Sequence, residues 1–191
     1  MGRLLLVRHA ATPGTRRAAF PTDEALDPAG LEEAGLLAAL LPPDRAVTSP
    51  ALRARQTAEA AGLDPVVEED LAECDFGSWA GMSLEQVGRV DPEGLRAWRE
   101  EAWARPHGGE SLAQLLARVG RFLERARGWR GTTVAVTHGG PVRGAILACL
   151  GAPAAAFWRI DVAPASLTEL HPAREGWRLV RANRTVARCV P

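Results

Sequence analysis

The stretch Leu4-Leu5-Leu6-Val7-Arg8-His9-Ala10 decides the fold, because four apolar residues change abruptly to an arginine and a histidine. A continuous apolar run of this length is typical of a strand that is buried on both faces of a parallel sheet. In open α/β sheets, ligands bind beyond the carboxyl ends of such strands. Arg8 and His9 are therefore expected at a binding edge of the sheet.

A second stretch, Thr132–Thr137, repeats the pattern and runs into His138, Gly139 and Gly140. One histidine at a strand end is more often a hydrogen-bonded structural residue than a catalyst. Two such histidines, one beside an arginine and one before a glycine pair, favour a site for an anionic ligand. Pro141 then begins a helix, so His138 and Gly139 stand at a helix amino end, where anions bind well.

The composition sets limits on the fold and on the partners. A chain of 191 residues suits one α/β domain, so residues 1–191 are expected to form a single domain. Its net charge is zero and no basic stripe is present, which excludes nucleic acid as a partner. No apolar run could cross a membrane, and the first strand leaves no room for a signal peptide, so we expect a cytoplasmic protein. The oligomeric state cannot be read from the sequence.

The amino-acid usage also removes several classes of site. Cys74, Cys149 and Cys189 lack the paired spacings of zinc sites and disulfide frameworks, so free and mostly buried thiols are expected. The chain contains no lysine and no tyrosine, and a phosphate-binding P-loop requires a lysine. No cluster of carboxylates suggests paired metal ions. We therefore expect neither a metal site nor a cofactor.

The segment Thr12–Thr22 is rich in Thr, Pro, Gly and Arg and is predicted to be a loop over the end of the first strand. Within it, the hydroxyls of Thr12 and Thr15 are candidate ligands for phosphate oxygens.

Ser49 and Pro50 predict a helix start directly after a short strand. Arg53 lies near the positive end of this helix and is assigned to the site. Arg55 lies about 200° further round the helix and is assigned to the surface.

The stretch LAECDFGSWAG, residues 71–81, is predicted to be a loop, in which either Glu73 or Asp75 could supply a proton. Composition alone does not choose between them. Residues 76–110 are predicted to form a helical cap over the site. His107 sits in a glycine-flanked turn of this segment and is expected to be exposed to solvent, with its role in specificity left open.

Arg8, Arg53, His9 and His138 converge on one place if this arrangement of strands is correct. Two guanidinium groups, two imidazoles and two helix amino ends suit a phosphate group, because guanidinium binds phosphate oxygens in pairs and stabilises a phosphoryl group in transfer. The expected partner is a small phosphorylated metabolite. Metal-free chemistry through a histidine nucleophile is the mechanism that remains.

The ordered motifs RHA (8–10), SPALRARQTA (49–58), LAECDFGSWAG (71–81), GGES (108–111) and VTHGG (136–140) resemble those of the histidine phosphatase superfamily, also called phosphoglycerate mutase-like. The resemblance implies a three-layer α/β/α fold with a mostly parallel central sheet. It also implies that His9 is the nucleophile and forms a phosphohistidine, and that Arg8, Arg53 and His138 hold the phosphoryl oxygens. Glu73 is chosen over Asp75 as the proton donor by this resemblance alone.

The chain departs from the family pattern just after the nucleophile. Ala10 and Ala11 stand where the family usually has Gly and often Glu, and Thr15 replaces a common asparagine. The carbonyl of Ala10 can still orient the ring of His9, so we expect catalysis to survive. Whether these departures alter substrate contacts is left open.

The resemblance leaves three functions to weigh. A phosphomonoester phosphatase comes first. The sequence of residues 71–81 is similar to that of α-ribazole phosphatases and of broad-specificity phosphatases, and it does not separate these two. The alternative is a cofactor-dependent phosphoglycerate mutase, but mutases of the family use a tyrosine and a lysine that this chain lacks, and Phe76 stands near the acid instead. A non-catalytic binder of phosphorylated ligands ranks last, because the nucleophile, the clamp and the acid are all present.

Overall fold

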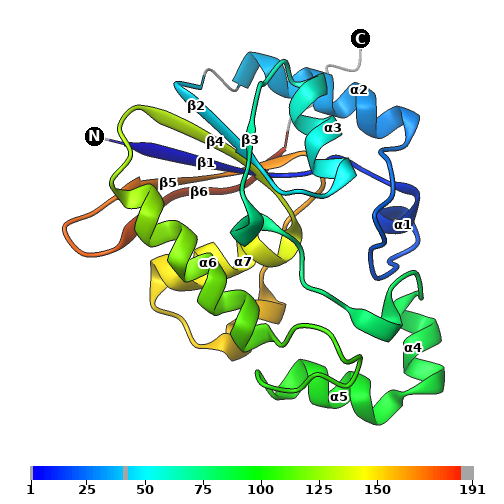
Figure 1. Cartoon of the computed structure of the whole chain (residues 1–191). Helices are drawn as coiled ribbons and strands as arrows, with labels where there is room; N and C mark the ends of the chain where they lie inside the picture. Colours follow the sequence, from blue (N-terminus) through cyan, green and yellow to red (C-terminus); the bar gives the residue numbers. More distant parts are fainter. Residues whose placement is uncertain (1, 41–42, 186–191) are drawn as a thin grey trace.

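The computed structural model describes residues 2–40 and 43–185, and a six-stranded sheet in the order β3-β2-β4-β1-β5-β6 lies at its centre (Figure 1). The strands are β1 (Arg3–Arg8), β2 (Arg45–Thr48), β3 (Val66–Val67), β4 (Thr132–Thr137), β5 (Ser166–Pro172) and β6 (Trp177–Thr185). Strands β1, β2, β3 and β4 are parallel, whereas β5 and β6 form an antiparallel hairpin at the edge. The expected mostly parallel sheet is confirmed.

Helices cover both faces of this sheet (Figure 1). Helices α2 (Pro28–Leu36) and α3 (Leu52–Ala60) pack on one face, and α6 (Leu112–Arg127) and α7 (Gly139–Leu150) on the other. In β1, Leu5 and Val7 point into the core under α2 and α3, while Leu4 and Leu6 point into the core under α6 and α7. Both faces of β1 are buried, which is why its sequence is apolar without alternation.

A helical segment extends away from the sheet between β3 and α6 (Figure 1). It contains a 3₁₀ turn, η3 (Gly77–Trp79), followed by α4 (Leu84–Val90) and α5 (Pro92–Glu100). Trp79, Val87 and Trp98 of this segment are buried together with Phe20, which follows α1, in a mostly aromatic cluster. The remaining short elements are α1 (Pro13–Arg16), η1 (Leu37–Leu40), η2 (Glu69–Leu71) and η4 (Ala154–Arg159). That this is one domain with a cap over residues 76–110 stays a prediction.

The structure corrects three local expectations. Residues 13–16 form the short helix α1 rather than a loop, because Thr12 caps it through a reciprocal pair of hydrogen bonds with Thr15. Helix α3 begins at Leu52 after Ala51 and is not capped by Ser49. His107, expected in solvent, is 2% exposed, because aromatic residues of the helical segment enclose it.

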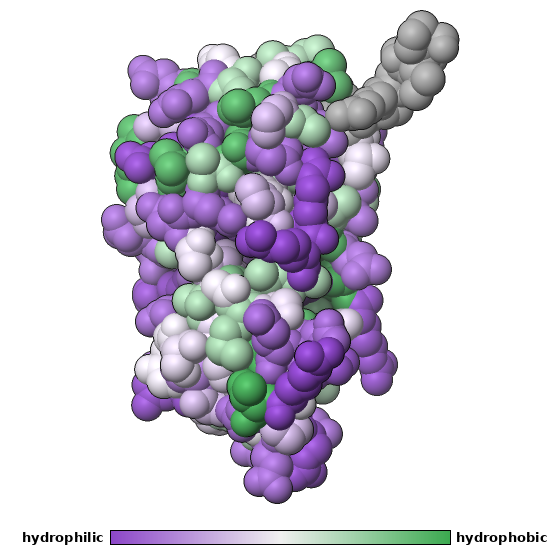
Figure 2. Space-filling view, turned by 90° about the vertical axis from the view of Figure 1, so that its right-hand side faces the viewer, coloured by the Kyte–Doolittle hydropathy of each residue, from purple (hydrophilic) through white to green (hydrophobic). Residues whose placement is uncertain are grey.

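Figure 2 shows a face on which hydrophilic residues predominate and hydrophobic residues are scattered among them. Among residues 2–40 and 43–185, none of the helices has the length and apolar character needed to cross a membrane. Cys74 and Cys149 are free thiols, the first buried and the second half-buried, and Cys189 lies outside the described residues.

Candidate active site

His9 and His138 meet at the carboxyl edge of two neighbouring strands. Strands β1 and β4 are parallel with Arg8 opposite Thr137, so the residue that follows each strand leaves the sheet at the same level. The two imidazole rings lie edge to face with centroids 5.1 Å apart, and both residues are buried. The structure therefore brings together two histidines that are far apart in the chain.

The ring of His9 is held in one tautomer. Its Nδ1 lies 2.7 Å from the carbonyl oxygen of Ala10, which can only accept, so Nδ1 carries the proton and Nε2 the lone pair. The amide of Ala10 donates in turn to the hydroxyl of Thr57 at 3.0 Å, which fixes this turn of backbone. Burial, and then the charges of Arg53 and Arg8, hold the pKa of His9 well below 6.5. His9 is thus neutral at pH 7, with a free base at Nε2.

Two guanidinium groups flank His9. Nε of Arg53 donates to Nε2 of His9 at 3.2 Å, and its Nη1 donates to the carbonyl of Thr22 at 2.7 Å. Nη1 of Arg8 donates to the carbonyl of Val162, while its Nε is buried without a partner among the described residues. Burial lowers the pKa of both arginines and the carboxylate of Glu73 opposes this. Both arginines keep unused donors that an anion could occupy.

His138 is oriented by Ser49, a residue whose role was not expected. Oγ of Ser49 lies 2.7 Å from Nε2 of His138 and accepts the amide of Ala51 at 3.3 Å. The serine proton is then free to donate to Nε2, which places the ring proton on Nδ1. That Nδ1 is buried and has no partner in the described part of the chain. Burial and the proximity of His9 keep the pKa of His138 well below 6.5, so it offers a neutral N–H donor.

Glu73 reaches the site from the loop after η2. Its carboxylate accepts the amide of Gly140 at 3.3 Å, at the start of α7, and the amide of Cys74 at 3.0 Å. A Cβ atom at position 140 would lie 2.2 Å from Oε1 of Glu73, so a larger residue there would displace the carboxylate from this position. The carboxylate of Asp75 instead accepts the amide of Gly77 at 2.9 Å within an exposed turn. Glu73 is therefore the acidic side chain near the helix end that carries His138.

Arg118 of α6 fixes the loop that carries Glu73. Its Nε and Nη2 donate to the two carboxylate oxygens of Glu110 at 2.7 and 2.8 Å. Its other donors bind backbone carbonyl oxygens of Asp70, Ala72 and Glu73 at 2.9, 2.7 and 3.1 Å. All five N–H groups of this side chain are thus used. No local pattern in the sequence indicated this role, because the partners come from distant segments.

Thr12, Thr15 and Gly139 were the predicted substrate-binding residues. The hydroxyl of Thr12 donates to Oε1 of Glu24 at 2.7 Å, and the hydroxyl of Thr15 bonds the backbone of Thr12 at 2.9 Å. Both hydroxyls therefore shape α1 in this structure, and a contact with phosphate stays a prediction. A Cβ at Gly139 would lie 3.7 Å from Nε of Arg8, so this glycine stands beside the guanidinium group.

His107 supports the helical segment from inside. Its ring lies against Phe76 and Trp79 with centroid distances of 5.8 and 5.0 Å, and its Nδ1 accepts the amide of Gly109 at 3.1 Å. Burial lowers its pKa. This contact set explains why a histidine in a glycine-flanked turn is nevertheless enclosed.

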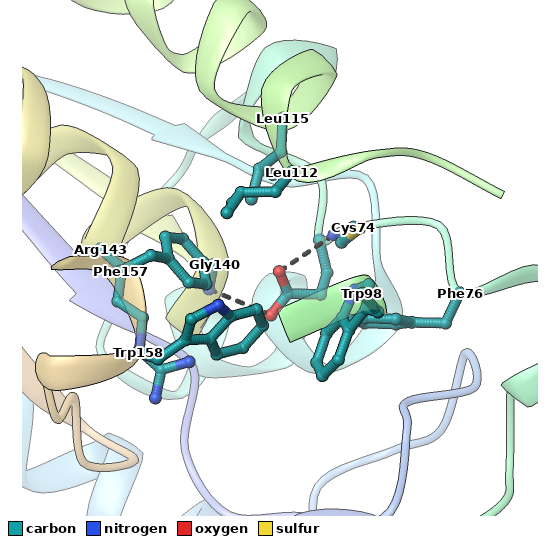
Figure 3. A pocket seen from close by; sticks show the side chains of 10 residues that line it. Cys74, Phe76, Trp98, Leu112, Leu115, Gly140, Arg143, Phe157 and Trp158 are labelled. Atoms are coloured by element: carbon teal, nitrogen blue, oxygen red, sulfur yellow. Dashed lines mark hydrogen bonds between the residues drawn. The ribbon is translucent and has the colours of Figure 1, made fainter. Parts of the chain in front are cut away.

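A cavity opens beside Glu73 (Figure 3). Its walls come from three parts of the chain: the segment after β3, helices α6 and α7, and the turn η4. Within the described ranges, no group of three or more His, Cys, Asp or Glu side chains is placed to hold a metal ion.

Comparisons with known proteins agree with this geometry. The family model described as histidine phosphatase superfamily (branch 1) matches residues 4–185. Phosphoserine phosphatase 1 of Hydrogenobacter thermophilus is 37% identical over 187 residues, covering 90% of this chain and 87% of that protein. A glucosyl-3-phosphoglycerate phosphatase of Mycobacterium tuberculosis is 32% identical over 173 residues, covering 80% and 77%.

Solved structures give the same result. A mycobacterial glucosyl-3-phosphoglycerate phosphatase in complex with VO3 superimposes with a TM-score of 0.82 at 29% identity, covering 96% of this chain and 99% of that one. The α/β three-layer fold expected from the sequence is therefore confirmed.

Proposed function

This chain belongs to the histidine phosphatase superfamily (branch 1), and on that premise we propose that His9 takes the phosphoryl group of a phosphomonoester and passes it to water. The chain is a phosphoric monoester hydrolase, the class named for the two phosphatases compared above. One observation carries the proposal: the lone pair of His9 Nε2 faces Arg53, in a buried setting that keeps the ring neutral. A neutral imidazole is what nucleophilic attack requires.

The geometry supports a role for each group. As Nε2 of His9 bonds to phosphorus, the bond from phosphorus to the alcohol oxygen breaks, and Glu73 gives its proton to that oxygen. Arg8, Arg53 and Nδ1–H of His138 hold the other phosphoryl oxygens and stabilise their charge. Glu73, now a carboxylate, takes a proton from the water that attacks the phosphohistidine. The cycle returns both residues to their starting states and needs no metal ion.

The finer substrate assignment is a proposal. The candidates are α-ribazole phosphate and a broad range of monoesters, together with phosphoserine and glucosyl-3-phosphoglycerate, which the names of relatives give for those proteins. Mutase activity ranks lower because the chain has no tyrosine or lysine to hold phosphoglycerate. We also propose that the enzyme works in the cytoplasm.

Replacing the nucleophile tests the proposal. The substitution His9→Ala should abolish phosphate release from p-nitrophenyl phosphate. The imidazole beside it, that of His138, has its Nε2 bound by Ser49 and cannot replace His9 as the nucleophile. Stopping the reaction of the parent enzyme with p-nitrophenyl phosphate after a short time, without acid, should preserve the acid-labile phosphohistidine. Mass spectrometry should then locate the phosphoryl group on His9. Strong inhibition of the parent by EDTA, or a phosphoryl group on another residue, would contradict the mechanism.

Interconversion of 3- and 2-phosphoglycerate, measured beside phosphate release, separates the mutase alternative. A mutase rate above the rate of phosphate release would reverse the ranking.

A further inference from the structure

The cavity beside Glu73 has a position that ties it to the proposed reaction. Glu73 lines the cavity, and Gly140, whose amide binds the Glu73 carboxylate, lines it as well. A proton donor must lie within hydrogen-bond reach of the leaving oxygen. The alcohol part of the substrate therefore has to lie next to Glu73, and the cavity opens at that place.

The walls of the cavity are mainly apolar and aromatic (Figure 3). They comprise two aromatic residues of the segment after β3, two leucines of α6 and two aromatic residues of η4: Phe76, Trp98, Leu112, Leu115, Phe157 and Trp158. The rings of Trp98 and Trp158 meet edge to face at 4.4 Å, and those of Phe157 and Trp158 at 4.9 Å. Such walls favour a flat apolar group, because a polar group would lose its hydrogen bonds to water there.

Two donors at the cavity lack partners. Nε of Arg143 donates to the carbonyl of Ile160 at 2.7 Å, and its guanidinium lies 5.4 Å from the ring centre of Phe157. Its terminal nitrogens make no hydrogen bond within the described residues. Nε1 of Trp158 is buried and likewise has no partner there. The N–H of Trp158 is a buried donor without an acceptor, which is costly, and the half-buried guanidinium of Arg143 adds a positive charge to the lining of the same cavity. Together these two groups point to an acceptor on the ligand.

We propose that this cavity binds the leaving alcohol, and that the substrates are phosphomonoesters of alcohols with a flat apolar or aromatic body and one anionic or acceptor group. The body lies between the aromatic walls, and the acceptor faces Arg143 and Nε1 of Trp158. This inference rests on the proposed function and names its substrate class. An ammonium group such as that of phosphoserine finds one carboxylate among the lining residues, that of Glu73, which the reaction uses.

Three phosphomonoesters of primary alcohols test the proposal, since their leaving groups have similar reactivity. They are 2-phenylethyl phosphate, 2-aminoethyl phosphate, and 2-phenylethyl phosphate with a carboxylate on the ring. We expect kcat/KM to be at least about 10-fold higher for the phenylethyl ester than for the aminoethyl ester, which is the scale of a filled apolar subsite. The ring carboxylate should raise kcat/KM further.

Matched variants locate the effect. Trp158→Leu should lower kcat/KM for the phenylethyl ester about 5-fold or more and lower it less for the aminoethyl ester, whereas Trp103→Leu, at a residue 76% exposed, should change neither. Arg143→Gln should remove the gain from the ring carboxylate, and Arg159→Gln, on the exposed surface, should retain it. Equal kcat/KM for all three esters, or equal effects of the two tryptophan variants, would overturn the inference.

A binding measurement keeps this inference separate from the proposed function. Calorimetry on the unaltered protein compares 2-phenylethylphosphonate with 2-aminoethylphosphonate, neither of which is hydrolysed. Tighter binding of the phenyl compound supports the inference even if no ester is turned over, an outcome that would refute the proposed function. Equal binding, with His9-dependent hydrolysis of all esters, overturns the inference and leaves the proposed function standing.

Discussion

Glu73 and Asp75 lie two positions apart in the chain, yet their surroundings differ. Glu73 is half-buried against the start of α7 and lines the cavity, whereas Asp75 is exposed and binds its own turn. The sequence offered both as proton donors, and the hydrogen bonds of the folded chain favour the first. Ser49 gives a similar lesson, because a residue expected to cap a helix instead contacts His138.

The substitution Glu73→Gln should reduce turnover of an alkyl phosphate by roughly 10² to 10⁴, the usual scale for the loss of a general acid. The first burst of nitrophenolate from p-nitrophenyl phosphate should be slowed less, because nitrophenolate leaves without a proton, whereas hydrolysis of the phosphohistidine still lacks its base. Asp75→Asn is the matched control and should be nearly silent. An unchanged rate in Glu73→Gln, with a large loss in Asp75→Asn, would transfer the role.

The substitution Ser49→Ala should lower kcat/KM about 10-fold, because His138 loses the hydroxyl that keeps its proton on Nδ1. The ¹⁵N chemical shifts of the His138 ring report the tautomer directly and should show a mixture in the variant. Ser78→Ala, at an exposed turn, serves as the control. A His138 spectrum that is identical in Ser49→Ala and the parent would contradict this positioning role.

At the scale of elements, the residues of the candidate site are positioned by strands and helices together. Strands β1 and β4 lead directly into His9 and His138, whereas the loop with Glu73 lies outside the strands. Two side chains hold this loop: the hydroxyl of Thr137 in β4 donates to the carbonyl of Leu71 at 2.6 Å, and Arg118 of α6 donates to the carbonyl of Glu73. A Cβ at Gly109 would lie 2.1 Å from the carbonyl oxygen of Asp75, so the backbones of the two loops are in direct contact there. The position of the acid is therefore set by β4, by α6 and by the segment that precedes α6.

The substitution Arg118→Met should lower kcat about 10-fold or more while KM changes little, because the loop with Glu73 loses three hydrogen bonds and Glu110 loses its partner. Arg121→Met is the control, since Arg121 is exposed and pairs with Asp70 at the surface. Urea unfolding of both variants separates loss of the fold from loss of position. If Arg118→Met and Arg121→Met changed kcat and KM to the same extent, a positioning role of Arg118 would be contradicted.

At the scale of the whole molecule, the site concentrates buried groups that the fold must keep in one protonation state. His9 and His138 have pKa values well below 6.5 in the folded chain, and the unfolded chain restores the usual value. As the pH falls through 6.5, the unfolded state therefore binds more protons than the folded state. The free energy of unfolding then decreases as the pH is lowered. We therefore expect the fold to be sensitive to mild acid.

The free energy of unfolding should fall by about 1.4 kcal/mol for each of these two histidines between pH 7.5 and pH 5.5, because each unfolded imidazole takes up nearly one proton. Urea titrations at both pH values measure the change. His9→Ala should reduce the pH dependence by about half of this effect, whatever its own stability at pH 7.5. A parent protein of equal stability at the two pH values would show that the histidines titrate normally.

The sequence by itself determined the α/β class and the strand ends, because both follow from local patterns, and the family resemblance of its motifs implied the three layers. An uninterrupted apolar run means burial on two faces, and a polar residue after such a run must lie at the edge of the sheet. Arg8, His9 and His138 could be placed in this way. The sequence also indicated Arg53, from the helix end and the angle between successive residues.

The tertiary structure alone decided the partners of those residues, because the contacts join distant positions. Ser49 and His138 are 89 positions apart, and Arg118 and the Glu73 carbonyl are 45 apart. Burial of His107, the engagement of the Thr12 and Thr15 hydroxyls, and the cavity beside Glu73 likewise arise where separate segments pack together. Local periodicity carries no information about such pairs, since their geometry exists only after the sheet, the helices and the helical segment have assembled.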